Sequence, residues 1–170
     1  MTFDFHTQLK LGDEGERIFM KHFGNLFHKN NNKNVKLPDF IHKNTGALAE
    51  IKYDDSPRAI RNAKNFQVNF FVELYSNSKF KSLGGPFRAV EEGVDYYVYI
   101  FKEPFRIFLF DAVKFRDTAS TLIGSKKYKD LFIKNKCWHT QGYAIPIHLF
   151  KNCEIKSETF SKGTRLNLKK

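Results

Sequence analysis

The sequence is short of cysteine and tryptophan, and it has no long apolar run: it contains two Cys and one Trp. Its longest apolar stretch, YYVYIF at 96–101, is far shorter than the ~20 residues that a membrane-spanning helix needs. Cys137 and Cys153 are too far apart to form a paired zinc motif, so we expect free thiols. The start, MTFDFHTQLK, lacks the basic-then-apolar order of a secretory signal. These absences predict a cytoplasmic protein without a membrane span.

Motifs of several enzyme classes are also missing. The sequence has no H-E-x-x-H and no paired CxxC, and its six histidines are scattered, which argues against a zinc enzyme. It has no P-loop, which argues against a nucleotide-dependent kinase or ATPase. No nucleophile elbow marks a serine hydrolase, although a Ser/His/Asp triad built from distant residues stays open.

Positive charge is what the sequence has in excess. Its 29 Lys and Arg against 18 Asp and Glu give a formal net charge of +11. Such an excess attracts polyanions, and nucleic acid is the commonest polyanion in a cell. A Lys- and Asn-rich composition also follows from an A/T-rich genome, so charge alone leaves that simpler explanation open. The densest basic run supplies the candidate nucleic-acid-binding residues Lys126, Lys127, Lys129, Lys134 and Lys136.

The length of 170 residues and the apolar content of 41% predict one globular domain over residues 1–170. No internal repeat or linker divides the chain. We expect a core over about 9–111 and a basic C-terminal elaboration over about 112–170.

Hydrophobic periodicity predicts a helix followed by two strands at the start of the chain. The helix is expected over residues 9–26, with Glu16 extending its apolar face. Short strands are expected over 35–42 and 47–53, because Asn44-Thr45-Gly46 between them is a turn signal.

A second helix is expected over residues 56–75. Ser56 followed by Pro57 is a typical helix start, and Gln67 interrupts the apolar face of the helix with an amide. Residues 79–93 contain Gly84-Gly85-Pro86 and are expected to form a loop.

The second half of the chain is expected to be richer in strands. Strands are predicted over 95–101, 106–111 and 143–150, and a short helix over 112–123. The tail, 151–170, is basic and shows no clear pattern.

Two carboxylates and a lysine come close together in the stretch LPDFIHKNTGALAEIKYD. Strand side chains alternate, so Glu50 and Lys52 share one face, and the strand pair can bring Asp39 beside Glu50. Singly, such residues usually serve turns and solvated faces. Together they suit Mg²⁺, which prefers oxygen ligands, and the Ile51 carbonyl is a further candidate ligand. Lys52 would orient a water or stabilise charge on a phosphate, as in metal-assisted phosphodiester hydrolysis.

Two further polar residues are expected to reach this stretch from the flanking helices. Glu16 would enter from the first helix and Gln67 from the second, if both helices pack on the same sheet. The sequence therefore predicts that both residues line one pocket with Asp39, Glu50 and Lys52.

Pro38-Asp39, ten intervening residues and Glu50-Ile51-Lys52 resemble the motif of the PD-(D/E)XK nuclease superfamily, which includes restriction endonucleases and Holliday junction resolvases. The resemblance covers about 9–75. It implies an α/β fold with a restriction-endonuclease-like core (αβββαβ), a mixed central sheet flanked by helices. It also implies that Asp39, Glu50, the Ile51 backbone carbonyl and Glu16 hold Mg²⁺ or Mn²⁺, that Lys52 serves the attacking water, and that Gln67 assists catalysis.

From this resemblance we expect a magnesium-dependent endodeoxyribonuclease, with DNA as partner and of phage or bacterial origin. We expect a structure-specific enzyme acting on branched or junction DNA, working as a homodimer because cutting two strands needs two sites. Two alternatives stay open: a sequence-specific restriction endonuclease, and a non-catalytic nucleic-acid-binding module on a nuclease-like fold.

Overall fold

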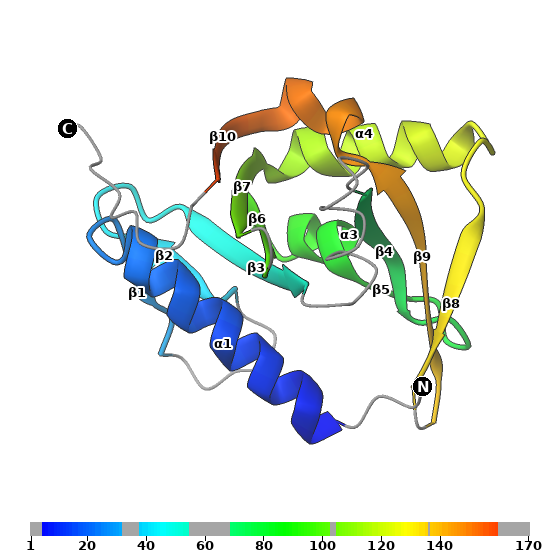
Figure 1. The fold of residues 1–170 in the computed structure, drawn as a ribbon, viewed down its shortest axis with the longest axis horizontal. Helices are drawn as coiled ribbons and strands as arrows, with labels where there is room; N and C mark the ends of the chain where they lie inside the picture. Colours follow the sequence, from blue (N-terminus) through cyan, green and yellow to red (C-terminus); the bar gives the residue numbers. More distant parts are fainter. Residues whose placement is uncertain (1–4, 32–37, 55–68, 103–104, 136, 160–170) are drawn as a thin grey trace.

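A computed structural model describes residues 5–31, 38–54, 69–102, 105–135 and 137–159 of the chain. These residues form an α/β structure with a mixed six-stranded sheet, a second sheet of four strands, and helices (Figure 1). The predicted α/β class, with a mixed central sheet and helices, is confirmed.

The six-stranded sheet has the order β1-β2-β3-β6-β7-β10. β3 and β6 run parallel, and every other neighbouring pair is antiparallel. A parallel pair needs a crossover connection, and here β4, β5 and α3 lie between the two strands in the chain. The strands are β1 (Phe27–Lys29), β2 (Phe40–His42), β3 (Leu48–Asp54), β6 (Tyr96–Phe101), β7 (Arg106–Asp111) and β10 (Glu154–Thr159).

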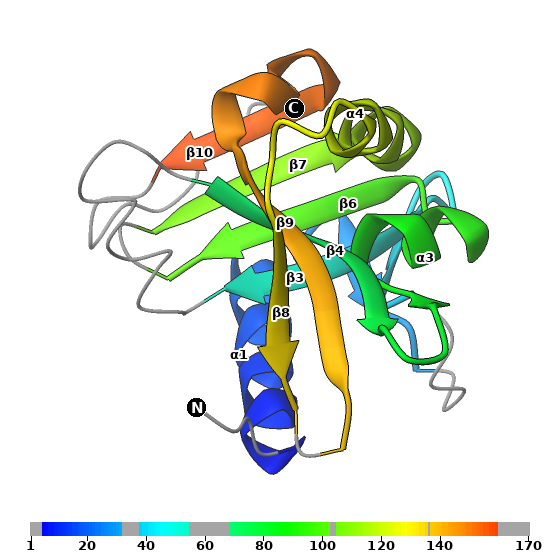
Figure 2. The same cartoon turned by 90° about the vertical axis from the view of Figure 1, so that its right-hand side faces the viewer.

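The four-stranded sheet is antiparallel throughout, with the order β5-β4-β9-β8. It crosses in front of the six-stranded sheet in the view of Figure 2. Its central pair joins segments that are far apart in the sequence. The strands are β4 (Asn69–Asn77), β5 (Ser82–Leu83), β8 (Asp130–Lys134) and β9 (His139–Pro146).

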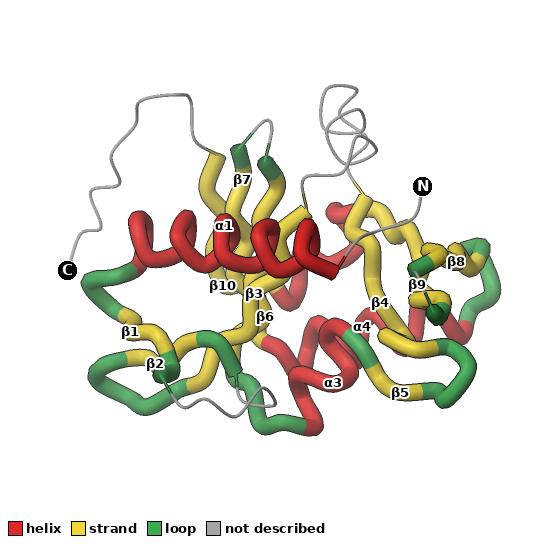
Figure 3. Tube along the Cα trace, turned by 90° about the horizontal axis from the view of Figure 1, so that it is seen from below, coloured by secondary structure: helices red, strands yellow, loops and turns green. Residues whose placement is uncertain are grey.

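Helices lie on both sides of the six-stranded sheet. In Figure 1, α1 is on one side of β3 and β6, while α3, α4 and the four-stranded sheet are on the other. Figure 3 shows α1 running across the strands. No helix among the described residues has the length and apolarity to span a membrane. The helices are α1 (Phe5–Phe23), α3 (Gly85–Glu91), α4 (Ala112–Gly124) and the 3₁₀ helix η1 (Ile147–Cys153).

The core has two parts because β6 is buried on both faces. Val98 and Ile100 belong to the cluster under α1, with Phe19 and Phe40. The alternate residues Tyr97, Tyr99 and Phe101 belong to the opposite cluster. Period-two alternation along one strand therefore fills both layers, as expected for a strand covered on both sides.

Phe70 of β4 is a central residue of the cluster between the two sheets. Its ring is fully buried and lies 4.7 Å from that of Tyr99 and 5.4 Å from that of Phe110, measured between centroids. The Tyr99 hydroxyl donates to Asp54 Oδ2 (2.9 Å) and accepts from the Phe71 N–H (3.2 Å). Apolar and polar contacts therefore join β4 to the six-stranded sheet.

Several sequence predictions are confirmed. β2 and β3 form the expected antiparallel pair, and Gly46 in the turn has the positive φ (73°) that glycine tolerates. The predicted strands at 95–101 and 106–111 and the helix at 112–123 correspond to β6, β7 and α4. Cys137 and Cys153 are both free thiols. α1 is present but ends at Phe23, just before Gly24.

The predicted helix over residues 56–75 is wrong in its described part. Asn69–Asn77 is strand β4, in which buried Phe70 and Val72 alternate with less buried neighbours. β4 forms its backbone hydrogen bonds with β9, which is distant in the sequence. A local signal for a helix start carries no information about such a partner. Residues 55–68, including Gln67, lie outside the described residues.

Three further boundaries differ from the predictions. The loop expected over 79–93 contains β5 and α3, since Pro86 is at a helix start. The strand expected over 143–150 is replaced by η1 after Pro146, whose ring removes a ladder donor. The tail contains β10, which pairs with β7.

Candidate active site

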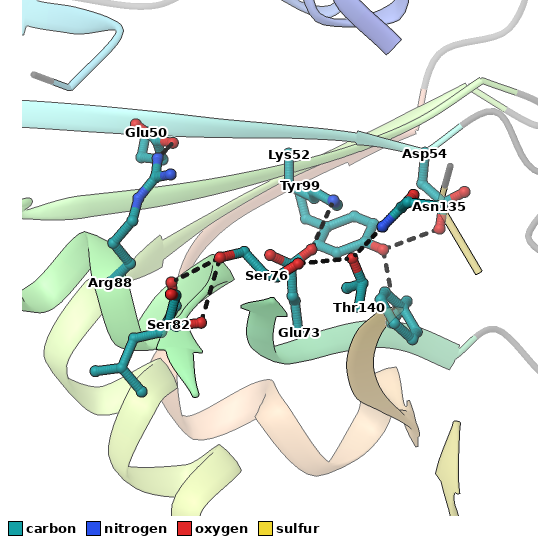
Figure 4. Close-up of polar contacts among 12 residues, drawn as sticks. Glu50, Lys52, Asp54, Glu73, Ser76, Ser82, Arg88, Tyr99, Asn135 and Thr140 are labelled. Atoms are coloured by element: carbon teal, nitrogen blue, oxygen red, sulfur yellow. Dashed lines mark hydrogen bonds and ion pairs between the residues drawn. The ribbon is translucent and has the colours of Figure 1, made fainter. Parts of the chain in front are cut away.

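Strand β3 directs its polar side chains away from α1. Ala49 and Ile51 pack in the cluster under α1. Glu50 and Lys52 point the other way, where Glu50 Oε1 accepts from Arg88 Nη2 (3.1 Å) and Lys52 Nζ lies 3.6 Å from Glu73 Oε2 (Figure 4). The predicted common face of Glu50 and Lys52 is thus present.

Asp39 lies at the start of β2 and is tied to β3. The register pairs Phe40 with Ala49, so one step further along brings Asp39 level with Glu50. Asp39 Oδ2 accepts the backbone N–H of Ile51 at 2.9 Å. Burial raises the pKa of Asp39 to about 6; the Ile51 hydrogen bond opposes this rise, and the Glu16 carboxylate adds to it.

Glu50 is half-buried, with a side chain 17% exposed. Its pKa is raised to about 8, chiefly by burial and next by the negative charge of Asp39, while Arg88 and Lys52 act in the opposite direction. Asp39 and Glu50 therefore interact through their charges, and the positive groups around them do not fully compensate. A divalent cation between them would favour the ionised form of both.

Arg88 is a site residue that the sequence reasoning missed. It lies on α3, where its Nη2 donates to Glu50 and its Nε is 3.4 Å from Glu92 Oε2. The sequence signal for α3 is Pro86, because proline is favoured in the first turn of a helix. The same preference is the basis of the helix start predicted at Ser56-Pro57.

Glu73 was also missed, because β4 was expected to be helical. Its side chain is 16% exposed and is the ion-pair partner of Lys52. Two glycines allow α3 to approach it: a Cβ on Gly84 would lie 2.1 Å from Glu73 Oε1, and Gly85 has φ +46°. The alternating pattern in NFFVELYSN was the available strand signal.

Glu16 lies on α1, close enough to Asp39 for the two charges to interact. It forms an ion pair with Lys29 of β1, and its charge raises the pKa of Asp39. The predicted roles of Glu16 and of Gln67, which lies outside the described residues, stay predictions.

The basic run lies on a different part of the molecule. Lys126, Lys127 and Lys129 are exposed in the connection from α4 to β8, and Lys134 is exposed on β8 itself. These residues belong to the edge of the four-stranded sheet, while Glu50 belongs to the six-stranded sheet. Lys136 lies outside the described residues.

The carboxylates fit a hard cation better than a soft one. Among the described residues no three His, Cys, Asp or Glu side chains form a ready metal cluster. Asp39 and Glu50 nevertheless supply oxygen donors and excess negative charge in one half-buried place, which suits Mg²⁺ or Mn²⁺. The Ile51 N–H serves Asp39, and a ligand role for the Ile51 carbonyl stays a prediction.

No family model matches the chain, and neither a curated protein nor a solved structure matches it. The function therefore rests on the geometry and charge of the residues around Asp39 and Glu50.

Proposed function

We propose that the protein is a metal-dependent endonuclease that hydrolyses phosphodiester bonds in DNA. The observation that carries this proposal is the pair of half-buried carboxylates, Asp39 and Glu50, with Lys52 on the same strand face as Glu50. A protein gains no stability from removing two interacting acids from part of their solvent, so their placement favours a role in binding a cation.

The order of elements supports a restriction-endonuclease-like core. α1 precedes the antiparallel strands β1, β2 and β3, and α3 precedes β6, which is parallel to β3. An αβββαβ core has this order, with β4 and β5 here as additions before α3. The acidic residues lie on β3 and just before β2, where the PD-(D/E)XK resemblance implies them.

Each residue has a distinct role in this proposal. Bound Mg²⁺ or Mn²⁺ would polarise the phosphate and lower the pKa of a bound water. Asp39 and Glu50 would hold the ion, and Glu16 would add negative charge beside Asp39. Lys52 would donate to the attacking water or the phosphate, released from its 3.6 Å contact with Glu73.

The substrate follows from charge and from the resemblance. A net charge of +11 favours a polyanion, and the proposed substrate is branched or junction DNA cut by a homodimer. A sequence-specific restriction endonuclease is the alternative within the same chemistry.

Nicking of supercoiled plasmid tests the proposal. We expect nicking with Mg²⁺ or Mn²⁺, little with Ca²⁺, and none in EDTA, because Ca²⁺ coordinates loosely and activates water poorly. Asp39→Asn should abolish nicking. The matched control is Asp117→Asn, which changes an aspartate that is 61% exposed on α4 and should leave nicking unchanged. Equal nicking in EDTA would contradict a metal mechanism.

A non-catalytic nucleic-acid-binding module is the second candidate. It is favoured by the two ion pairs, Glu50 with Arg88 and Lys52 with Glu73, in which each proposed catalytic side chain already has an oppositely charged partner. Retarded migration of DNA in a gel, without nicking under any metal condition, would support this candidate.

A further inference from the structure

The described part of the molecule exposes three large aromatic side chains, and all belong to the two hairpins of the four-stranded sheet. Phe80 is 71% exposed at the tip between β4 and β5. Phe132 is 57% exposed on β8, and Trp138 is 40% exposed between β8 and β9. Exposed aromatic surface gathered on one element is typical of an interaction site.

The two hairpin tips are held together by hydrogen bonds. The N–H of Ser78 donates to the carbonyl of His139 at 2.8 Å. Asn135 Nδ2 donates to Thr140 Oγ1 (2.9 Å), which donates to the carbonyl of Ser76 (3.1 Å; Figure 4). Phe80 and Trp138 are therefore carried by tips that are fixed relative to each other, so little ordering is needed when a ligand binds.

Exposed cations accompany these rings. Lys79 Nζ lies 5.4 Å from the centroid of the Phe80 ring. Lys79 and Lys81 flank Phe80 in the sequence. Lys134 is exposed two residues after Phe132 on β8, and so on the same face of that strand. Aromatic faces beside lysines match single-stranded nucleic acid, whose bases stack and whose phosphates need positive charge. The same combination is unfavourable for a basic protein partner.

We propose that Phe80 and Trp138 form a stacking surface for unpaired nucleobases, with Lys79, Lys81 and Lys134 contacting the adjoining phosphates. This proposal rests on the proposed function in taking nucleic acid as the ligand, but it does not require cleavage. β4 connects the two sites: Glu73 contacts Lys52, and Ser78 lies five residues further along. Five residues of extended chain between Glu73 and Ser78 span roughly 17 Å, which is about five base steps of DNA. Unpaired bases at a branch would thus select where the duplex arm enters the candidate active site.

Trp138 gives a direct signal, because it is the single tryptophan in the sequence. A base stacked on an indole quenches its fluorescence, so titration with a single-stranded oligothymidine in EDTA should quench Trp138 strongly. Blunt duplex of equal length should quench it much less. Equal quenching by both, or none by either, would overturn the stacking proposal.

Phe80→Ala separates stacking from general attraction to phosphate. We expect it to weaken binding of single-stranded DNA by roughly five- to a hundred-fold, with blunt-duplex binding little changed. Ile155→Ala removes another exposed apolar side chain (53% exposed) from β10 and should have no effect. Equal single-strand affinities of the two variants would contradict the proposal.

Two measurements keep this proposal separate from the nuclease proposal. Quenching without metal-dependent nicking would overturn the nuclease and support the stacking surface, whereas nicking without quenching would do the reverse. Sedimentation of wild type and Phe80→Ala tests self-association through the same tips. A dimer that becomes a monomer on substitution would assign the surface to a second copy of the chain and overturn nucleobase binding.

Discussion

The two sheets of this protein present opposite kinds of surface. The six-stranded sheet keeps Asp39 and Glu50 half-buried. Loss of solvation raises the pKa of both, and the charge of Glu16 adds to the rise at Asp39 while the charge of Asp39 adds to the rise at Glu50. The four-stranded sheet exposes Phe80, Phe132 and Trp138, and Lys134 with them. Half-buried acids suit chemistry at one atom, while exposed rings and cations suit attraction of an extended polyanion. The comparison indicates that chemistry and capture of the substrate are divided between the sheets.

Phe70→Ala would break the connection between the two sheets. Because the ring is fully buried between them, its removal should destabilise the fold by about 3–5 kcal/mol. Chemical denaturation monitored by circular dichroism measures this loss. Phe132→Ala is the control, since that ring is 57% exposed and its loss should change stability little. Equal effects of the two substitutions would mean that the sheets are not joined through Phe70.

Lys52→Ala would remove the proposed chemistry from the six-stranded sheet without removing capture. Loss of one electrostatic contact to developing charge costs about 10²–10³ in rate, and Lys52 is one of 29 basic residues. We therefore expect single-turnover cleavage to fall by about that factor, with DNA affinity almost unchanged. Cleavage at the wild-type rate would remove Lys52 from the catalytic group and favour the binding module.

The raised pKa values of Asp39 and Glu50 predict how stability depends on pH. The folded protein holds protons up to about pH 6 at Asp39 and about pH 8 at Glu50, whereas the unfolded chain releases them near 3.8 and 4.5. Their contribution is therefore complete below about pH 4 and is lost as the pH rises towards 8. In EDTA we expect the melting temperature to fall between pH 5 and pH 8.5, because Asp39 and Glu50 lose their protons over that range.

Glu50→Gln checks the origin of that pH dependence. The amide cannot ionise, so the fall in melting temperature between about pH 6 and pH 8.5 should become smaller in the variant. Added Mg²⁺ should raise the wild-type melting temperature most at the alkaline end, because metal binding competes with protons. An unchanged slope in Glu50→Gln would place the titrating group elsewhere.

Replacing Lys134 and Lys136 together by Ala should weaken capture while sparing chemistry. Each lost phosphate contact lowers the slope of log affinity against log salt by roughly 0.9 for duplex DNA. The salt dependence should therefore become shallower, with single-turnover cleavage of fully bound DNA unchanged. A wild-type slope would show that this basic run does not contact DNA.

The segment around Asp39 and Glu50 was predictable because its signals are local. The turn at Asn44–Gly46 sets the register of β2 and β3, and side-chain alternation then fixes the face of Glu50 and Lys52. The apolar runs of β6 and β7 were equally clear.

The central pair of the four-stranded sheet was not predictable, because its pairing is not local. β4 pairs with β9, more than sixty positions later in the chain, so no short pattern announces the partner. The Ser56-Pro57 signal favoured a helix over 56–75, and that prediction concealed the strand position of Glu73. Arg88 was missed for a different reason, since α3 lies where Gly84-Gly85-Pro86 predicted a loop.

Calorimetric titration of Mn²⁺ tests most directly whether Asp39 and Glu50 form one metal site. We predict saturable binding of Mn²⁺ to the wild type at pH 8, loss of that binding in Asp39→Asn and in Glu50→Gln, and no change in Asp117→Asn. Circular dichroism of each variant confirms that the fold is retained. Equal Mn²⁺ binding by the wild type and both site variants would contradict a shared metal site, as would no binding at all.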